Sequence, residues 1–133
     1  MQEKLLTKQQ QVNEIIRCGK DPAYFIRKYA KIQHPLKGTI PFDLYDFQED
    51  CLNDFQNNRF NIVLKSRQLG LSTISAAYAT WLAIFYKDKN VLVIATKLAT
   101  AQNFIKKVHV MLQSLPTWLL MPKFEPSKQQ ISF

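Results

Sequence analysis

Cysteine is scarce in this 133-residue sequence, and its scarcity argues against two classes of protein. The two cysteines, Cys18 and Cys51, form no CxxC pair, and no cluster of His, Cys or Asp has the spacing of metal ligands. A structural zinc site is therefore not expected, and one possible cysteine pair does not make a disulfide framework. We expect two reduced thiols, as in a cytoplasmic protein.

Long apolar runs are also missing. The N-terminal residues MQEKLLTKQQQ are too polar for a signal peptide. The most apolar window, Ala76 to Tyr86, is far shorter than the roughly 20 residues that cross a bilayer, so we interpret it as a buried helix. With 47% hydrophobic and 21% charged residues, the chain is typical of one modest globular domain.

Acidic residues are few relative to basic ones. The sequence has 10 Asp and Glu against 18 Lys and Arg, a net charge of +8. This excess favours a polyanionic partner, nucleic acid or nucleotide, although ordinary solubilising charge gives the same count.

The apolar periodicity predicts helices separated by two short apolar runs. FNIVLKS, residues 60–66, and NVLVIAT, residues 90–96, look like buried strands of a parallel sheet because they lack in-out alternation. The segment from His34 to Phe42 has two prolines and a glycine, so we expect loop or extended chain there. QQISF, residues 129–133, is a possible third strand. The predicted helices cover residues 2–19, 22–32, 46–58, 71–86 and 98–115.

The order strand, helix, strand, helix predicts an α/β fold with a parallel sheet. Between the first strand and its helix lies KSRQLGLST, which is compared with the phosphate-binding template G-x-x-x-x-G-K-[ST]. With Gly70 as the second glycine, the hydroxyl position falls on Ser72, the lysine position on Leu71 and the first glycine on Lys65. Lys65 and Arg67 would supply the missing positive charge. The alternative is a basic turn with no ligand.

LKSRQLGLST resembles the deviant Walker A loop of the large terminase subunits of tailed bacteriophages, the DNA-packaging ATPases. The resemblance implies a P-loop NTPase fold, a parallel sheet flanked by helices, with ATP and Mg²⁺ as cofactors. Lys65 matches the family's variant lysine position at the loop start, Arg67 its loop arginine, and Ser72 its Mg²⁺ ligand. Leu71 departs from members that have GK[ST]. Arg67 is accordingly the expected catalytic residue.

PFDLYDFQEDCL, residues 41–52, is similar to the adenine-recognition segment of the same family. There Phe47 would stack near the base and Gln48 would read its edge, because a carboxamide offers both a donor and an acceptor. Weaker similarity covers about residues 21–115. The implied nucleotide-binding residues are Phe47, Gln48, Lys65, Ser66, Arg67, Gln68, Leu69, Gly70, Leu71, Ser72 and Thr73.

No apolar run ending in adjacent acidic residues follows the loop, although ATP hydrolysis needs such carboxylates. We therefore expect a helical N-terminal segment over residues 1–40 and a truncated, partial P-loop ATPase domain over residues 41–133. The Walker B strand and the nuclease domain of the family would be absent. Alone, this chain would bind nucleotide weakly and be inactive as an ATPase.

The resemblance implies part of a motor that packages double-stranded DNA into procapsids. Its implied partners are the portal protein, the small terminase subunit and further copies in a ring, in the host cytoplasm and not in the mature virion. One rival is a helicase-like DNA translocase. Another is a catalytically dead, basic DNA-binding remnant with a structural loop.

Other basic residues receive weaker assignments. Lys106 and Lys107 could face DNA, but a pair of lysines on a helix is more typical of a solvated face, and His34 and His109 are given no role. Thr96 and Lys97 lie where the second predicted strand ends, the edge at which α/β sites form, although Lys97 is equally typical of a solvated loop.

Overall fold

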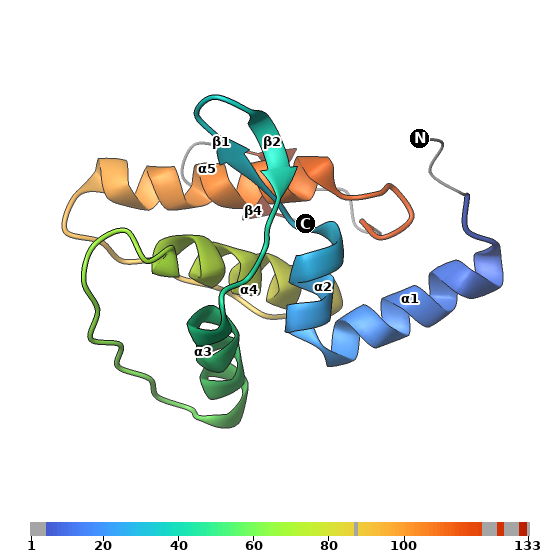
Figure 1. The fold of residues 1–133 in the computed structure, drawn as a ribbon, viewed down its shortest axis with the longest axis horizontal. Coiled ribbons are helices and arrows are strands. Elements are labelled where there is room, and N and C mark those ends of the chain that lie inside the picture. The colour runs from blue at the N-terminus through green and yellow to red at the C-terminus, as the bar shows by residue number, and fades with distance from the viewer. Residues whose placement is uncertain (1–4, 87, 121–124, 127–130, 133) are drawn as a thin grey trace.

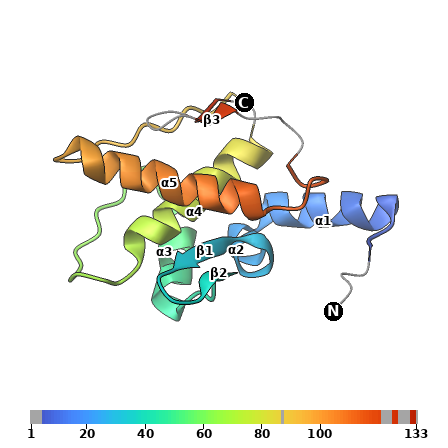
Figure 2. The same ribbon diagram turned by 90° about the horizontal axis from the view of Figure 1, so that it is seen from above.

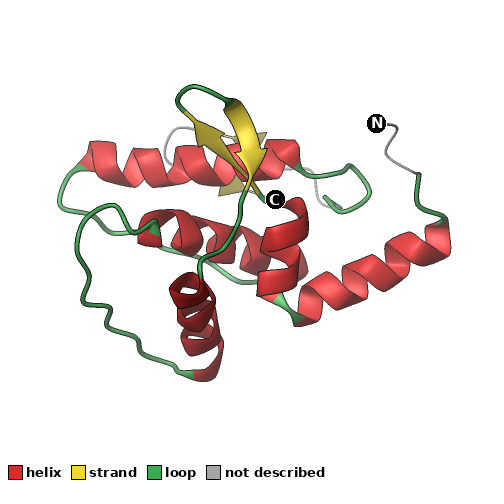
Figure 3. Cartoon of the chain, in the orientation of Figure 1, coloured by secondary structure: helices red, strands yellow, loops and turns green. Residues whose placement is uncertain are grey.

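The computed structural model describes residues 5–86, 88–120, 125–126 and 131–132. Helices dominate it, and the strands are short (Figures 1 and 3). In chain order the elements are α1 (Lys8–Lys20), α2 (Pro22–Tyr29), β1 (Lys31–His34), β2 (Gly38–Pro41), α3 (Asp46–Asn57), α4 (Leu71–Phe85), α5 (Leu98–Ser114), β3 (Glu125–Pro126) and β4 (Ile131–Ser132).

Local sequence signals set where the first helices begin. Thr7 caps α1 with a reciprocal pair of hydrogen bonds, in which its hydroxyl accepts from the Gln10 N–H and Gln10 Oε1 accepts from the Thr7 N–H. The Asp21 carboxylate accepts from the Tyr24 N–H to cap α2, and Pro22 occupies the first helical position, where no N–H is needed.

Helix α4 is the centre of the molecule. It contacts α2, α3 and α5, and it buries Ile74, Ala76, Ala77 and Trp81. The prediction that residues 76–86 form a buried helix is thus confirmed over most of that stretch. Helices α4 and α5 run in the same direction, so the segment between them returns along their length (Figures 1 and 2). No helix among the described residues is long and apolar enough to cross a membrane.

The hairpin β1–β2 covers one side of α5 (Figure 2). Its strands pair antiparallel, with Lys31 opposite Pro41 and His34 opposite Gly38. The turn needs Gly38, whose φ of 72° lies in the left-handed region. The second pair, β3 and β4, is also antiparallel and joins Glu125 to Ser132.

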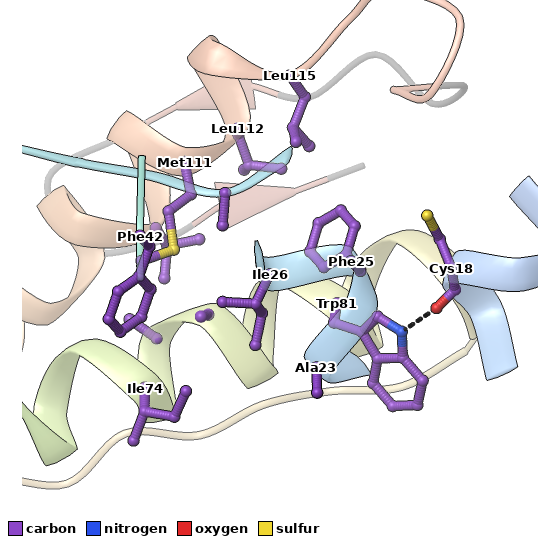
Figure 4. Packing of buried hydrophobic residues seen from close by; sticks show 14 of the residues in the cluster. Cys18, Ala23, Phe25, Ile26, Phe42, Ile74, Trp81, Met111, Leu112 and Leu115 are labelled. Atoms are coloured by element: carbon purple, nitrogen blue, oxygen red, sulfur yellow. Dashed lines mark hydrogen bonds between the residues drawn. The ribbon is translucent and has the colours of Figure 1, made fainter. Parts of the chain in front are cut away.

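One hydrophobic core joins residues from both predicted segments, 1–40 and 41–133 (Figure 4). Trp81 belongs to this core, and its Nε1–H donates to the buried carbonyl of Cys18 at 2.7 Å. Because Trp81 comes from α4 and Cys18 from α1, this bond ties the first helix to the central one. The fully buried side chains include Phe25, Ile26, Leu52, Ile74, Trp81, Met111, Leu112 and Leu119.

The carboxylate of Glu14 ties α1 to α2. It accepts hydrogen bonds from the Tyr24 hydroxyl at 2.8 Å and the Tyr29 hydroxyl at 2.6 Å, and it pairs with the Lys28 ammonium at 3.1 Å. Partial burial acts to raise the pKa of Glu14, but the three hydrogen bonds outweigh it and lower the pKa.

The five predicted helices are confirmed within a few residues where the structure describes them. The first helix begins at Lys8, whereas the prediction began it at residue 2. Residues 2–4 of the predicted helix lie outside the described part of the chain. The second ends at Tyr29 because the chain turns there into β1, whose alternating exposure was not recognised in the sequence. The predicted strand at residues 129–133 is described only at Ile131–Ser132, which is β4.

The predicted parallel P-loop sheet is wrong. Among the described residues, both sheets are two-stranded and antiparallel. Residues 60–66 and 90–96 form no strand; Ile62 and Leu64 are 100% exposed, and Leu92 and Ile94 are 83% and 85% exposed. An apolar run becomes a buried strand only with hydrogen-bonded neighbours and helices on its faces. Here neither run has a ladder partner in the described part of the chain.

Replacing Trp81 by Phe should lower the free energy of unfolding by about 1 to 3 kcal/mol, because the buried Cys18 carbonyl loses its donor. Chemical denaturation checks this. The matched control is Trp118→Phe, a half-buried tryptophan whose indole N–H makes no hydrogen bond among the described residues. Equal losses in the two variants would show that the bond to Cys18 adds nothing beyond ring size.

Replacing Glu14 by Gln should cost about 1 to 2 kcal/mol of stability near neutral pH, because three donors lose a charged acceptor. Since the pKa of Glu14 is lowered from 4.5, its contribution is present above that pH and lost as the pH falls through the lowered value. Unfolding curves of both proteins should therefore converge in acid. The control Asp50→Asn, at an exposed position of α3, should change the free energy of unfolding near neutral pH by less than about 0.5 kcal/mol.

Candidate functional site

The loop from Asn58 to Gly70 leads into the N-terminus of α4 without regular secondary structure. Its backbone is left-handed at Gln68, with φ 61°, and at Gly70, with φ 70°. Left-handed backbone is uncommon for a glutamine and costs roughly 1 to 2 kcal/mol. Gly70 is the N-cap of α4 and has no side chain to accept from the free N–H groups of the first turn. Those N–H groups therefore remain available to an acceptor from outside the helix.

Gln48 holds this loop in place. It is only 2% exposed, and its Nε2 donates to the Leu69 carbonyl at 3.1 Å. Its Oε1 accepts from the Tyr45 N–H at 3.0 Å, so both ends of the carboxamide are engaged. A Cβ on Gly70 would lie 2.6 Å from Gln48 Nε2, which shows how closely the two residues approach. The structure thus brings together the predicted adenine segment and the predicted phosphate loop.

The charged side chains of the loop point outward. Lys65 and Arg67 are exposed, as are Ser66, Gln68 and Ser72. The Lys65 ammonium lies 3.4 Å from the Ser66 carbonyl and so folds back along its own loop. Among the described residues, no hydrogen bond joins Arg67 or Ser72 to another predicted site residue.

The charge of the loop sequence is one-sided. From Phe55 to Lys87 the sequence has no acidic residue, whereas Arg59, Lys65, Arg67 and Lys87 are basic. Such a stretch attracts anions, although α3, which contacts the loop through Gln48, carries four carboxylates, Asp46, Glu49, Asp50 and Asp54. No group of three or more His, Cys, Asp or Glu that could hold a metal occurs in the described part of the chain.

Leu71 occupies the template's lysine position and serves the core instead. Its half-buried side chain packs against the central hydrophobic cluster. A lysine at position 71 would bury its aliphatic stem among apolar residues. Leucine therefore suits the packing of α4 against the core at this position. The basic residues of the loop itself are Lys65 and Arg67, which are exposed.

Phe47 lies at the start of α3, 41% exposed and stacked on Tyr45 with ring centroids 5.7 Å apart. The two rings are nearly parallel, 8° between planes, and leave apolar surface open to solvent. This is a surface on which a flat aromatic group can stack.

Lys107 is the functional candidate that sequence reasoning missed. It was predicted with Lys106 to be a solvated face, but only Lys106 is exposed. Lys107 is half-buried, and its Nζ donates to the hydroxyl of Thr73 in the first turn of α4 at 3.3 Å. The signal available in the sequence was the position of Lys107 on α5. It directly precedes Val108 and lies about one turn before Met111, and both of these residues are buried.

The end of the second predicted strand carries no comparable arrangement. Thr96 and Lys97 are both exposed, and Lys97 is the N-cap residue of α5 without a side-chain cap. The expected sheet edge is absent from the described residues, so the reason for assigning these two residues to a site disappears.

The chain matches no protein-family model. Its functional assignment therefore depends on the loop, on Gln48 and on the residues that surround the start of α4.

Gly70→Ala should destabilise the protein for two separable reasons, the left-handed φ and the approach to Gln48. The control is Gly38→Ala, which has nearly the same φ of 72° but nothing within 4 Å of the new Cβ. We expect about 1 to 2 kcal/mol for Gly38→Ala and more for Gly70→Ala. In a Gln48→Ala background the excess should vanish. An unchanged excess in that double mutant, measured by urea denaturation, would contradict the contact.

Proposed function

We propose that this chain is the ATP-binding part of a terminase large subunit, the motor that couples ATP hydrolysis to packaging of viral DNA. The observation that supports this proposal is the contact of Gln48 with Leu69 and Gly70. Two segments that resemble this family meet in space at the start of α4, through residues 21 positions apart in the sequence.

The residues present fit a polyphosphate. The exposed Lys65 and Arg67 would neutralise its charge, and the uncapped first turn of α4 offers free N–H donors. Ser72, exposed in that turn, would be the protein's ligand for Mg²⁺, with phosphate oxygens as the others. When bound, Mg²⁺ supplies charge neutralisation between the phosphates. The strained backbone at Gln68 fits a loop shaped for a ligand.

The adenine would stack on the exposed ring of Phe47. For Gln48 to read the base edge, its Nε2 would exchange the Leu69 carbonyl for adenine, which would release the loop backbone. Base binding and loop conformation would then be coupled through one side chain. The chain would act in the host cytoplasm, with double-stranded DNA, the portal protein, the small subunit and further copies in a ring as partners.

Two alternatives follow from the same loop. A helicase-like translocase would bind nucleotide in the same way, but helicases usually keep the lysine that Leu71 replaces. A catalytically dead DNA-binding remnant is favoured by the net charge of +8 alone.

Lys65→Ala should lower ATP affinity by about ten- to a hundredfold, because it removes one charged donor to the phosphates. Titration of a fluorescent ATP analogue in the presence of Mg²⁺ measures this. Lys89→Ala is the matched control, since it removes an exposed lysine beyond the C-terminal end of α4. Unchanged binding by Lys65→Ala would reject the relocated lysine. DNA binding that is indifferent to Lys65→Ala and Ser72→Ala, with no ATP binding, would favour the remnant.

A further inference from the structure

A cavity of about 540 Å³ lies between α5, β1 and the first turn of α4. Its volume is within the range of about 300 to 1,000 Å³ that small-molecule sites occupy. The polar side chains in its wall come from three elements that are distant in the sequence. They are Gln33 of β1, Thr73 of α4, and Lys106, Lys107, His109 and Gln113 of α5.

The wall contains two lysines and no carboxylate. Lys107 is half-buried, and in the described part of the chain it forms no ion pair; its one hydrogen bond there goes to the neutral hydroxyl of Thr73. An anion in the cavity would gain a charge-assisted hydrogen bond from the Lys107 ammonium, which has no counter-ion among the described residues. The same wall holds His109, whose Nε2 is buried without a hydrogen-bond partner among the described residues. That atom has almost no accessible surface, so the anion is assigned to Lys107 and not to His109.

The position of the cavity indicates which anion it takes. Thr73 is the third residue of α4, one turn from Gly70 and next to the proposed Mg²⁺ ligand Ser72. Lys107 thus places its ammonium beside the first turn of the helix that follows the loop. In the usual phosphate-binding loop that charge comes from the position of Leu71, which here packs in the core.

We infer that this cavity binds the terminal phosphoryl groups of the nucleotide, with Lys107 supplying from α5 the positive charge that Leu71 lacks. This inference rests on the proposed nucleotide site and deepens it. Lys65 would reach the phosphates from the start of the loop, and Lys107 would reach them from α5, where its ammonium contacts Thr73 in the first turn of α4. Phosphate chains held by two cations are more tightly bound than those held by one.

The test compares Lys107→Met with Lys89→Met in the full chain, because Lys89 is exposed and does not line the cavity. Each variant removes one ammonium and keeps the length of the side chain, but only Lys107 contacts Thr73. Binding of ATP, AMP and inorganic tripolyphosphate is measured by calorimetry. We expect Lys107→Met to lower the affinity for ATP and for tripolyphosphate by about ten- to a hundredfold, and the affinity for AMP by less than about twofold. Lys89→Met should change the affinity for each ligand by less than about threefold, and Lys107→Arg should restore most of the loss.

The outcomes separate this inference from the proposed function. If ATP binds and depends on Lys65 but not on Lys107, the inference is overturned and the proposed function stands. A different outcome is that tripolyphosphate binding depends on Lys107, whereas ATP binds no more tightly than tripolyphosphate and does not depend on Lys65. The proposed function then fails and the anion site stands. Equal weakening of ATP and AMP by Lys107→Met would mean a structural role and overturn the inference. If Lys107→Met weakened only the binding of a DNA duplex, the inference would also be overturned, because the cavity would then be assigned to the DNA backbone.

Discussion

The burial of α4 on nearly all sides is the constraint on which the rest of the structure depends. Its apolar sequence leaves no face for solvent, so α2, α3 and α5 must surround it. The N-terminal end of α4, at Gly70, is open to solvent, because Ser72 is exposed while Ile74 is fully buried. The free N–H groups of the helix are therefore presented at the one end of α4 where the chain also carries Lys65 and Arg67.

A second consequence concerns how the loop is fixed. Trp81 anchors the far end of α4 to α1 through the Cys18 carbonyl, and Gln48 anchors the near end to α3 through the Leu69 carbonyl. Both bonds join a buried side chain to a backbone carbonyl across segments distant in the sequence. Backbone acceptors of this kind have a fixed position, so the loop conformation depends on where α3 docks. A change in Gln48 is thereby transmitted to the residues that would meet phosphate.

Much of the helical structure could be predicted from sequence because its signals are local. The Thr7 and Asp21 caps, Pro22 and the apolar stripes all act within a few residues. The sheet could not be predicted in the same way, because strand formation depends on partners elsewhere in the chain. The runs at residues 60–66 and 90–96 have no such partner among the described residues. For the candidate site, template spacing indicated Gly70 and the family resemblance indicated Gln48, but no pattern reports that a side chain from α5 reaches Thr73.

Leu71 and Lys107 are best understood together. A lysine at position 71 would have to leave the apolar cluster in order to reach an anion, which would cost the packing that docks α4 against its neighbours. A lysine on α5 avoids that conflict, since Val108 and Met111 bury the helix while Lys107 extends along its edge to Thr73. The charge at the start of α4 then depends on the contact between α4 and α5 rather than on the loop alone. Any movement of α5 relative to α4 would alter the electrostatic potential at the first turn, so helix packing and anion affinity become parts of one equilibrium.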